Sequence, residues 1–172
     1  MLIRLLDPGN LVVPLYRMSR WWHQRGGRPC RWVAYAFYRL NLLVTGAHIV
    51  PGATIGARLT MPHPMGVCIG NAVIGDDAKI MGGVVLGLRT AYLHGSDELF
   101  PTIGDRVFLG AHSVVVGPVT IGDDCLIGPG TVVSSSIPQR SIVSARPPLV
   151  MRRDEPASAS APEDRPLDVE VR

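Results

Sequence analysis

The feature that most constrains the fold of this chain is a six-residue repeat of aliphatic side chains. Counting in steps of six from Ile49, and starting the count again at Ile74 and at Ile103, gives twelve positions that are all Ile, Leu, Val or Met. These positions are Ile49, Ile55, Met61, Val67, Ile74, Ile80, Leu86, Ile103, Leu109, Val115, Ile121 and Ile127. Seven of them precede a glycine, and IGDDAK at 74–79 returns as IGDDCL at 121–126. A period of six fits neither a helix nor a flat strand. It predicts stacked coils with three short strands per turn.

Each hexad is predicted to form one side of a triangular prism. Its aliphatic residue points inward near a corner, where glycine or another small residue lets the chain bend. Stacked coils then pair at the usual strand spacing of about 4.8 Å. Aromatic rings do not fit a prism this narrow, and the chain has only 6% aromatic residues although 47% of it is hydrophobic. This composition excludes disorder throughout and does not suit a helix bundle.

Composition divides the chain into three zones. Residues 1–46 hold seven of the ten aromatic residues and two predicted helices, 10–24 and 29–45, separated by the breaker Gly26-Gly27-Arg28-Pro29. Residues 47–150 carry the repeat, which a loop at 88–102 interrupts. Residues 151–172 are rich in Pro, Ala, Ser and acidic residues, so we expect a disordered tail.

Charge and cysteine content limit the cellular compartments and the classes of binding partner that fit this chain. The net charge is +3, and residues 1–46 contain seven arginines against Asp7. Arginines among hydrophobic residues usually mark a solvated helix face, so no nucleic-acid partner is expected. The three cysteines form no paired motif, which favours a reducing cytoplasm over a disulfide framework or a zinc site. No segment reads as a signal peptide, and the longest hydrophobic zone is too short to span a bilayer.

The hexads resemble those of the hexapeptide acyltransferase family, whose fold is a left-handed parallel β-helix. The order of features is typical of serine acetyltransferases: IVPGATIGARLTMPHPMGVCIGNAVIGDDAKI, then VVLG, a protruding loop, FPTIGDRVFLGAHSVVVGPVTIGDDCLIGPGTVV and a closing SSIP. Acetyltransferases of exopolysaccharide clusters share this pattern. The resemblance implies a mainly β fold with a short helical N-terminal segment. It also implies an O-acetyltransferase that uses acetyl-CoA as co-substrate, needs no metal and assembles as a homotrimer or a dimer of trimers.

His63, in Met61-Pro62-His63-Pro64-Met65-Gly66, stands where the family places its catalytic histidine. The resemblance implies that its imidazole takes the proton of an acceptor hydroxyl and passes it to the leaving thiolate. It also implies that the loop at 88–102 reaches a neighbouring subunit, so that the active site lies between subunits.

The chain departs from the serine acetyltransferase pattern around this histidine. His48 replaces an acid fifteen residues earlier, Pro62 replaces an aspartate, and Leu99-Phe100 replace an Arg-His pair. The family uses these positions to hold the amino acid and assist the base, so the acceptor stays open between serine and a sugar hydroxyl. Loop side chains are candidate substitutes. The candidate acceptor contacts are His48, His94, Asp97, Glu98 and Phe100.

Coenzyme A lies along the seam of the later coils in this family. By register, the seam residues of this chain are Gly110, Ala111, Gly128 and Pro129, and Arg146 is the candidate partner of the phosphates, with Arg152 and Arg153 beyond it. We interpret His112 as a surface or trimer-interface residue, with contact to the substrate as the alternative.

Two other functions remain as hypotheses. A metal-dependent β-helix enzyme needs three converging histidines, and His48, His63 and His112 lack the spacing. A non-catalytic trimeric scaffold fits the missing acid and second histidine. The helices also admit two interpretations. They cap the open end of the prism, or residues 10–45 place this cytoplasmic protein peripherally on the inner membrane face, through Trp21, Trp22 and the arginines.

Overall fold

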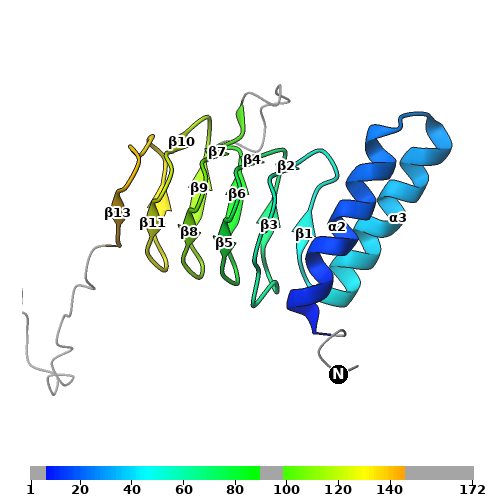
Figure 1. Cartoon of the computed structure of the whole chain (residues 1–172), viewed down its shortest axis with the longest axis horizontal. Helices are drawn as coiled ribbons and strands as arrows, with labels where there is room; N and C mark the ends of the chain where they lie inside the picture. Colours follow the sequence, from blue (N-terminus) through cyan, green and yellow to red (C-terminus); the bar gives the residue numbers. More distant parts are fainter. Residues whose placement is uncertain (1–6, 90–98, 146–172) are drawn as a thin grey trace, which may run out of the picture.

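The computed structural model of the chain describes residues 7–89 and 99–145. Two antiparallel helices, α2 (Pro8–Gln24) and α3 (Arg28–Thr45), stand against one end of a prism of short strands (Figure 1). Their bounds agree with the helices predicted at 10–24 and 29–45 to within two residues. The tail predicted at 151–172 and most of the predicted loop lie outside the described residues.

Three parallel sheets form the sides of the prism. The first sheet contains β1 (His48–Ile49), β3 (Cys68–Ile69), β6 (Val85–Gly87), β9 (Val114–Val116) and β12 (Val132–Val133). The second contains β2 (Thr54–Ile55), β4 (Val73–Ile74), β7 (Thr102–Ile103) and β10 (Thr120–Ile121). The third contains β5 (Lys79–Ile80), β8 (Phe108–Leu109), β11 (Leu126–Ile127) and β13 (Ile142–Val143). Each strand pairs with the strand one coil away, which confirms the predicted stack of coils.

The core of the prism is the aliphatic ladder that the six-residue repeat predicts. All twelve predicted positions, from Ile49 to Ile127, are at most 4% exposed, but strand pairing aligns Ile69, and not the predicted Val67, with Ile49 and Leu86. A second inward column lies two residues before the ladder residues and uses mostly smaller side chains, such as Ala53, Ala72 and Ala78, and Val67 belongs to this column. Alternating large and small residues fill the narrow interior, so the coils bury apolar surface without aromatic rings.

The second inward column contains two hydroxyls among aliphatic neighbours. Ser113 and Thr131 are buried, and neither hydroxyl has a hydrogen-bond partner among the described residues. Val67 and Val84 occupy the same register in earlier coils. An unpartnered buried hydroxyl costs about 1–3 kcal/mol, because its bonds to water are lost without replacement.

Replacement of Thr131 by valine, which has nearly the same shape, should therefore stabilise the protein. We expect Thr131→Val to raise the free energy of unfolding by about 1 kcal/mol and the melting temperature by roughly 2–4 °C, measured by calorimetry. The control is Thr120→Val, because Thr120 is exposed on the second sheet. A lower melting temperature for Thr131→Val would show that this hydroxyl has a partner in solution.

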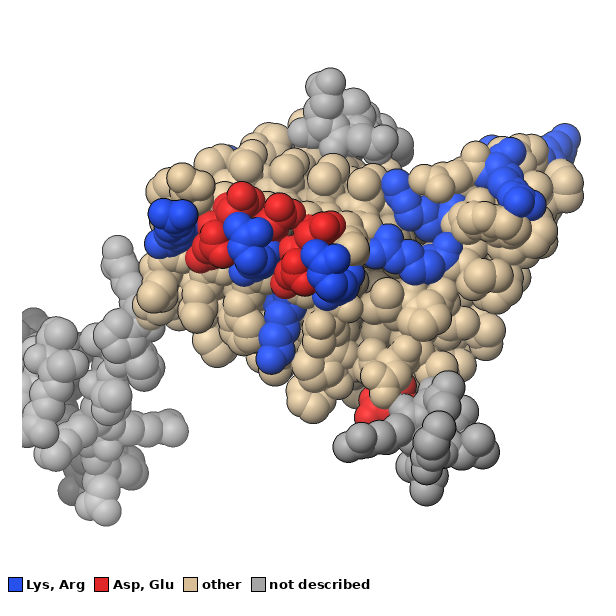
Figure 2. All heavy atoms as spheres, viewed as in Figure 1, with Lys and Arg blue, Asp and Glu red and all other residues tan. Residues whose placement is uncertain are grey.

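Acidic and basic side chains gather along the corner between the second and third sheets (Figure 2). The carboxylate of Asp105 accepts a hydrogen bond from the backbone N–H of Asp76 in the previous coil, at 2.7 Å. An ion pair also joins neighbouring coils along this corner. Arg106 donates to Asp124 at 2.7 and 2.9 Å, and this bond lowers the pKa of Asp124. The aspartate of the repeated Ile-Gly-Asp sequence therefore links its coil to the one before it.

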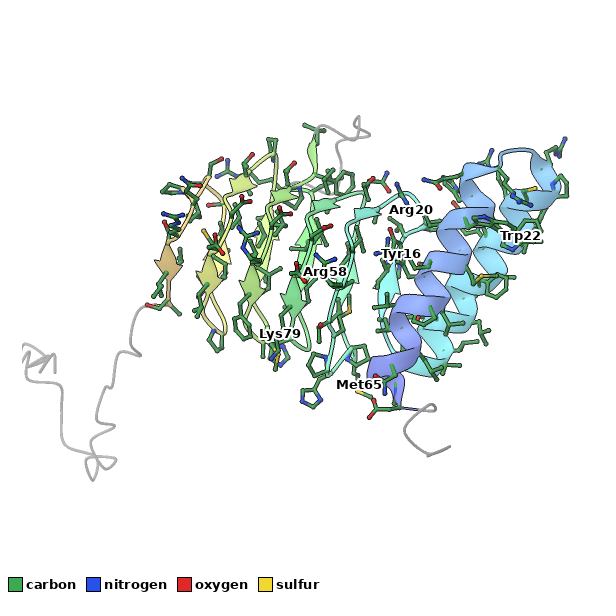
Figure 3. All side chains as sticks on the ribbon, in the orientation of Figure 1. Tyr16, Arg20, Trp22, Arg58, Met65 and Lys79 are labelled. Atoms are coloured by element: carbon green, nitrogen blue, oxygen red, sulfur yellow. The ribbon has the colours of Figure 1, made fainter. Side chains whose placement is uncertain are left out.

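Helix α2 contacts the first coil through polar side chains that point toward it (Figure 3). The Tyr16 hydroxyl donates to the Ala53 carbonyl at 2.7 Å, and Arg17 donates to the Ile55 carbonyl at 2.6 Å. Arg20 donates to the carbonyl of Ala53 and to the Thr54 hydroxyl. The prediction of a solvated arginine face is wrong for these two arginines, because the end coil offers carbonyls that have no strand beyond them.

The outer surface of the helix pair is more apolar. Trp32 and Leu43 of α3 are 78% and 83% exposed. No helix within residues 7–89 or 99–145 has the length and apolarity needed to cross a bilayer.

Candidate functional site

Four stacked turns form the corner between the third and first sheets, and His63 lies beside the first of them. We call these turns the His63 corner: Met65–Gly66, Gly82–Gly83, Ala111–His112 and Pro129–Gly130. Backbone hydrogen bonds join each turn to the next: Gly83 N–H donates to Met65 at 3.1 Å, His112 N–H to Gly82 at 2.9 Å, and Gly130 N–H to Ala111 at 2.9 Å.

The segment that carries His63 is irregular, and two prolines explain this. Pro62 and Pro64 flank the histidine, and proline cannot donate to a strand ladder. The third sheet is accordingly reduced at this coil to an isolated bridge between Thr60 and Lys79. Pro64 is buried, and its carbonyl accepts from the Val67 N–H at 3.1 Å. These features fix the backbone on both sides of an exposed imidazole.

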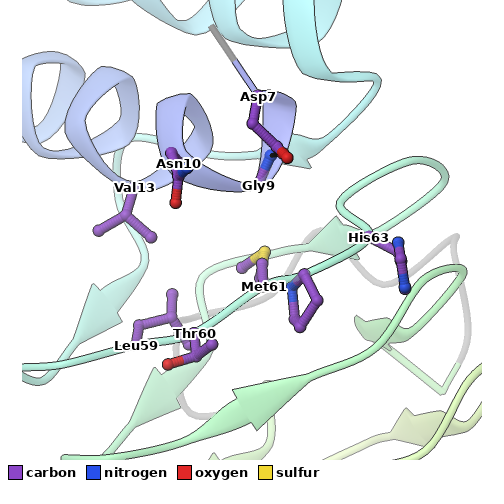
Figure 4. Close-up of a pocket in the computed structure, with 9 residues that line it drawn as sticks. Asp7, Gly9, Asn10, Val13, Leu59, Thr60, Met61 and His63 are labelled. Carbon is purple, nitrogen blue, oxygen red and sulfur yellow. Dashed lines mark hydrogen bonds between the residues drawn. The ribbon is translucent and has the colours of Figure 1, made fainter. Parts of the chain in front are cut away.

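A hollow of about 570 Å³ lies between this segment and the first turn of α2. Figure 4 shows His63 at the end of the hollow farthest from Val13, with Asp7 on the helix side. Among the described residues, Asp7 is the one carboxylate that lines the hollow, and its side chain accepts from the Gly9 N–H at 2.8 Å. Asp7 and Asn10 were not predicted from the sequence as site residues. The one sequence signal here is Asp7-Pro8, a capping pair that predicts the N-terminal end of α2.

His48, at the position of the missing acid, is engaged elsewhere. Its Nε2 shares a short hydrogen bond with the Tyr38 hydroxyl of α3, and its Nδ1 lies 3.6 Å from the Cys68 sulfur. Both ring nitrogens therefore have partners, and neither is left to orient His63. Burial raises the pKa of the Cys68 thiol, which keeps it protonated and unreactive. This group of three side chains connects α3 to the first coils.

The base of the loop lies at the other end of the first sheet from His63. The Phe100 ring covers Gly70, where a Cβ atom would come within 2.8 Å of its Cδ1. Four residues of extended chain, roughly 13 Å, separate this corner from the His63 corner. Phe100 and His63 therefore do not meet within one chain. His94, Asp97 and Glu98 lie outside the described residues.

The four residues of the predicted coenzyme seam stack on the His63 corner. Gly110 donates to the Ile127 carbonyl at 2.8 Å, and a Cβ atom there would lie 2.6 Å from the Pro129 nitrogen. Gly110 and Gly128 are buried, so close coil stacking is itself a reason for glycine at 110. Ala111 and Pro129 form the accessible part of the seam. Arg146, Arg152 and Arg153 lie outside the described residues.

The chemistry available at this corner is that of an exposed imidazole beside a surface of small residues. An imidazole can exchange protons near neutral pH, which suits a general base. A surface of small residues lets a flexible ligand approach the backbone. Within the described ranges, no three His, Cys, Asp or Glu side chains come together as a metal site would require.

Comparison with known proteins gives consistent results. The family model described as bacterial transferase hexapeptide (six repeats) matches residues 100–135. A serine acetyltransferase of Mycobacterium tuberculosis is 40% identical over 151 residues, which are 87% of this chain and 63% of the relative. A serine acetyltransferase of Helicobacter pylori is 40% identical over 140 residues, which are 81% of this chain and 78% of the relative.

Solved structures show the same likeness. The serine acetyltransferase of Neisseria gonorrhoeae, in complex with serine, superposes with a TM-score of 0.74 at 30% identity, over 82% of this chain and 56% of that one. The chain therefore spans between about half and four fifths of the proteins it matches. The fold that they share is the left-handed parallel β-helix, and in this chain two helices precede it.

Proposed function

Because this chain belongs to the serine acetyltransferase family, we propose that it moves the acetyl group of acetyl-CoA to the hydroxyl of a small molecule, with His63 as the general base. The observation that carries the proposal is the placement of an exposed histidine on the same corner as the accessible seam residues Ala111 and Pro129. The donor thioester and the base then lie along one edge of the prism.

The proton and the acyl group move in a defined order. The neutral imidazole of His63 takes the proton of the acceptor hydroxyl, and the oxygen attacks the thioester carbonyl carbon. The tetrahedral intermediate collapses when the carbon–sulfur bond breaks. The His63 imidazolium then gives its proton to the departing thiolate, so the enzyme returns to its starting state with an ester and free coenzyme A as products.

Serine is the first acceptor to examine, since the Neisseria relative is described in complex with serine. The departures at His48, Pro62 and Phe100 argue for including acceptors without an amino-acid carboxylate. The decisive experiment measures thiol release from acetyl-CoA with serine, homoserine and a set of sugars. We expect release that depends on one class of acceptor. Tight coenzyme A binding without release in any of these reactions would favour the scaffold hypothesis.

The assembly we propose is a homotrimer or a dimer of trimers in the cytoplasm. It is supported by the separation of the loop base from His63 within one chain, which a neighbouring subunit would bridge. The three cysteines are also free, as a reducing compartment requires. We expect light scattering to give about three or six times the chain mass of 18.5 kDa. A mass of one chain would contradict the proposal.

A further inference from the structure

Among the four turns of the His63 corner, the second residue is glycine in three and His112 in the fourth. The second residue of each turn has a positive φ: 74° at Gly66, 71° at Gly83, 56° at His112 and 66° at Gly130. This backbone region costs a residue with a side chain about 1–2 kcal/mol. The three glycines avoid that cost, and the histidine does not.

Among the described residues, four of the five other side chains with a positive φ form ion pairs in the fold, and the exception is Arg140. Arg58 pairs with Asp77, and Arg106 pairs with Asp124, along the opposite corner. His112 makes no side-chain hydrogen bond or ion pair with any residue in the described ranges, and it is exposed. No contact within residues 7–89 and 99–145 therefore explains the presence of histidine at a position that favours glycine.

The imidazole of His112 lies back across the turn below it. A Cβ atom on Gly83 would lie 2.6 Å from its Cε1 and 3.0 Å from its Cγ, so only glycine leaves room for the ring. A Cβ atom on the adjacent Gly82 would lie 3.0 Å from the His63 carbonyl and 3.6 Å from the His63 Cβ. The two histidines thus lie beside neighbouring glycines of one turn, His63 beside Gly82 and His112 beside Gly83.

This placement puts His112 on the first coil of the coenzyme seam, two coils beyond the coil of the base. It directly follows Ala111, and two strand spacings, roughly 10 Å, separate its coil from the coil of His63. His112 is also the only side chain with an N–H group in the four turns of the His63 corner. The backbone N–H groups of the four left-handed residues already donate to carbonyls of neighbouring turns.

We propose that His112 is a second catalytic imidazole, which donates a hydrogen bond to the thioester carbonyl oxygen as that oxygen becomes negative. This inference rests on the proposed function, because it needs a thioester held at the His63 corner. A donor fixed in advance at a developing oxyanion typically contributes about 10²–10³-fold in rate. His112 would supply it on the opposite side of Gly82 and Gly83 from the base.

The test replaces His112 by the residue that the other turns carry. His112→Gly should lower kcat about 10²-fold and leave the KM for acetyl-CoA within about threefold, since the lost bond forms only in the transition state. The melting temperature should stay the same or rise, because the strained backbone is relieved. His112→Asn tolerates the same backbone and keeps an N–H donor, so it should recover about tenfold of the lost kcat.

The matched control is Arg106→Gly, which removes a side chain of similar φ from the opposite corner and should leave kcat unchanged. A wild-type kcat for His112→Gly, or an effect confined to KM or to melting, would overturn the inference. If His63→Ala is inactive while His112→Gly is fully active, the inference alone fails and the proposed function stands. If the wild-type protein releases no thiol with any acceptor, both fail together.

Discussion

We expect His63→Ala to lower kcat/KM for thiol release about 10²–10⁴-fold, because the acceptor hydroxyl then loses the group that takes its proton. The side chain is exposed, and Pro62 and Pro64 hold the backbone on both sides of it. The substitution should therefore change the free energy of unfolding by less than about 0.5 kcal/mol. Initial rates at saturating acetyl-CoA, together with a calorimetric melting curve, measure both quantities on the same preparation.

A neighbouring exposed side chain provides the control. Met65 lies two residues after His63 in the same irregular segment and is 77% exposed. Met65→Ala should keep kcat/KM within a few-fold of the wild type if His63→Ala acts through the imidazole. Equal losses in the two variants would show that the segment tolerates no change of shape, and full activity of His63→Ala would exclude this histidine as the base.

Gly75→Ala should strongly destabilise the protein, because it adds an atom where two coils touch through their backbones. A Cβ atom at Gly75 would lie 2.7 Å from both the carbonyl carbon and the oxygen of Gly104, which are backbone atoms of the next coil. It would also meet the Asp105 carboxylate, which accepts from the Asp76 N–H. The coils must move apart, so we expect a loss of about 2–3 kcal/mol and a melting temperature roughly 6–9 °C lower by calorimetry.

Gly87→Ala is the matched control for this substitution. Gly87 also lies directly after a buried repeat residue, but a Cβ atom there would have no heavy atom within 4 Å, and its φ is not in the left-handed region. Its melting temperature should stay within about 2 °C of the wild type. A Gly75→Ala protein as stable as Gly87→Ala would mean that the coils are not in close backbone contact at Gly75.

The six-residue repeat was sufficient to predict the stack of coils, because the same residue pattern recurs at each of them, whereas the left-handedness came from the family resemblance. Ile80, Leu109 and Ile127 each need the interior of the prism, and a single register satisfies all of them. Local signals also predicted both helices, since Gly26 and Gly27 end one helix and the Pro29 turn begins the next. These features depend on near neighbours in the chain.

Contacts between distant elements could not be predicted in the same way. The hydrogen bonds of Arg17 and Arg20 depend on where α2 lands on the first coil, and no periodicity specifies that. The pairing of His48 with Tyr38 likewise joins a strand to a helix face. The role inferred for His112 depends on its positive φ and on the position of its imidazole beside Gly83. The sequence pattern predicts neither of them.

The stacking of coils on a helix pair has a consequence for how such a chain acquires its structure. Cys68 pairs with Val85 and Val85 with Val114, so each strand of the first sheet finds its partner within the preceding coil (Figure 1). The helices that cover the starting end precede all the coils in the chain. During synthesis, each new coil can therefore pack against helices or coils that have already been synthesised. During folding, each new strand pairing closes only a short loop, so the entropic cost of loop closure is small at each step.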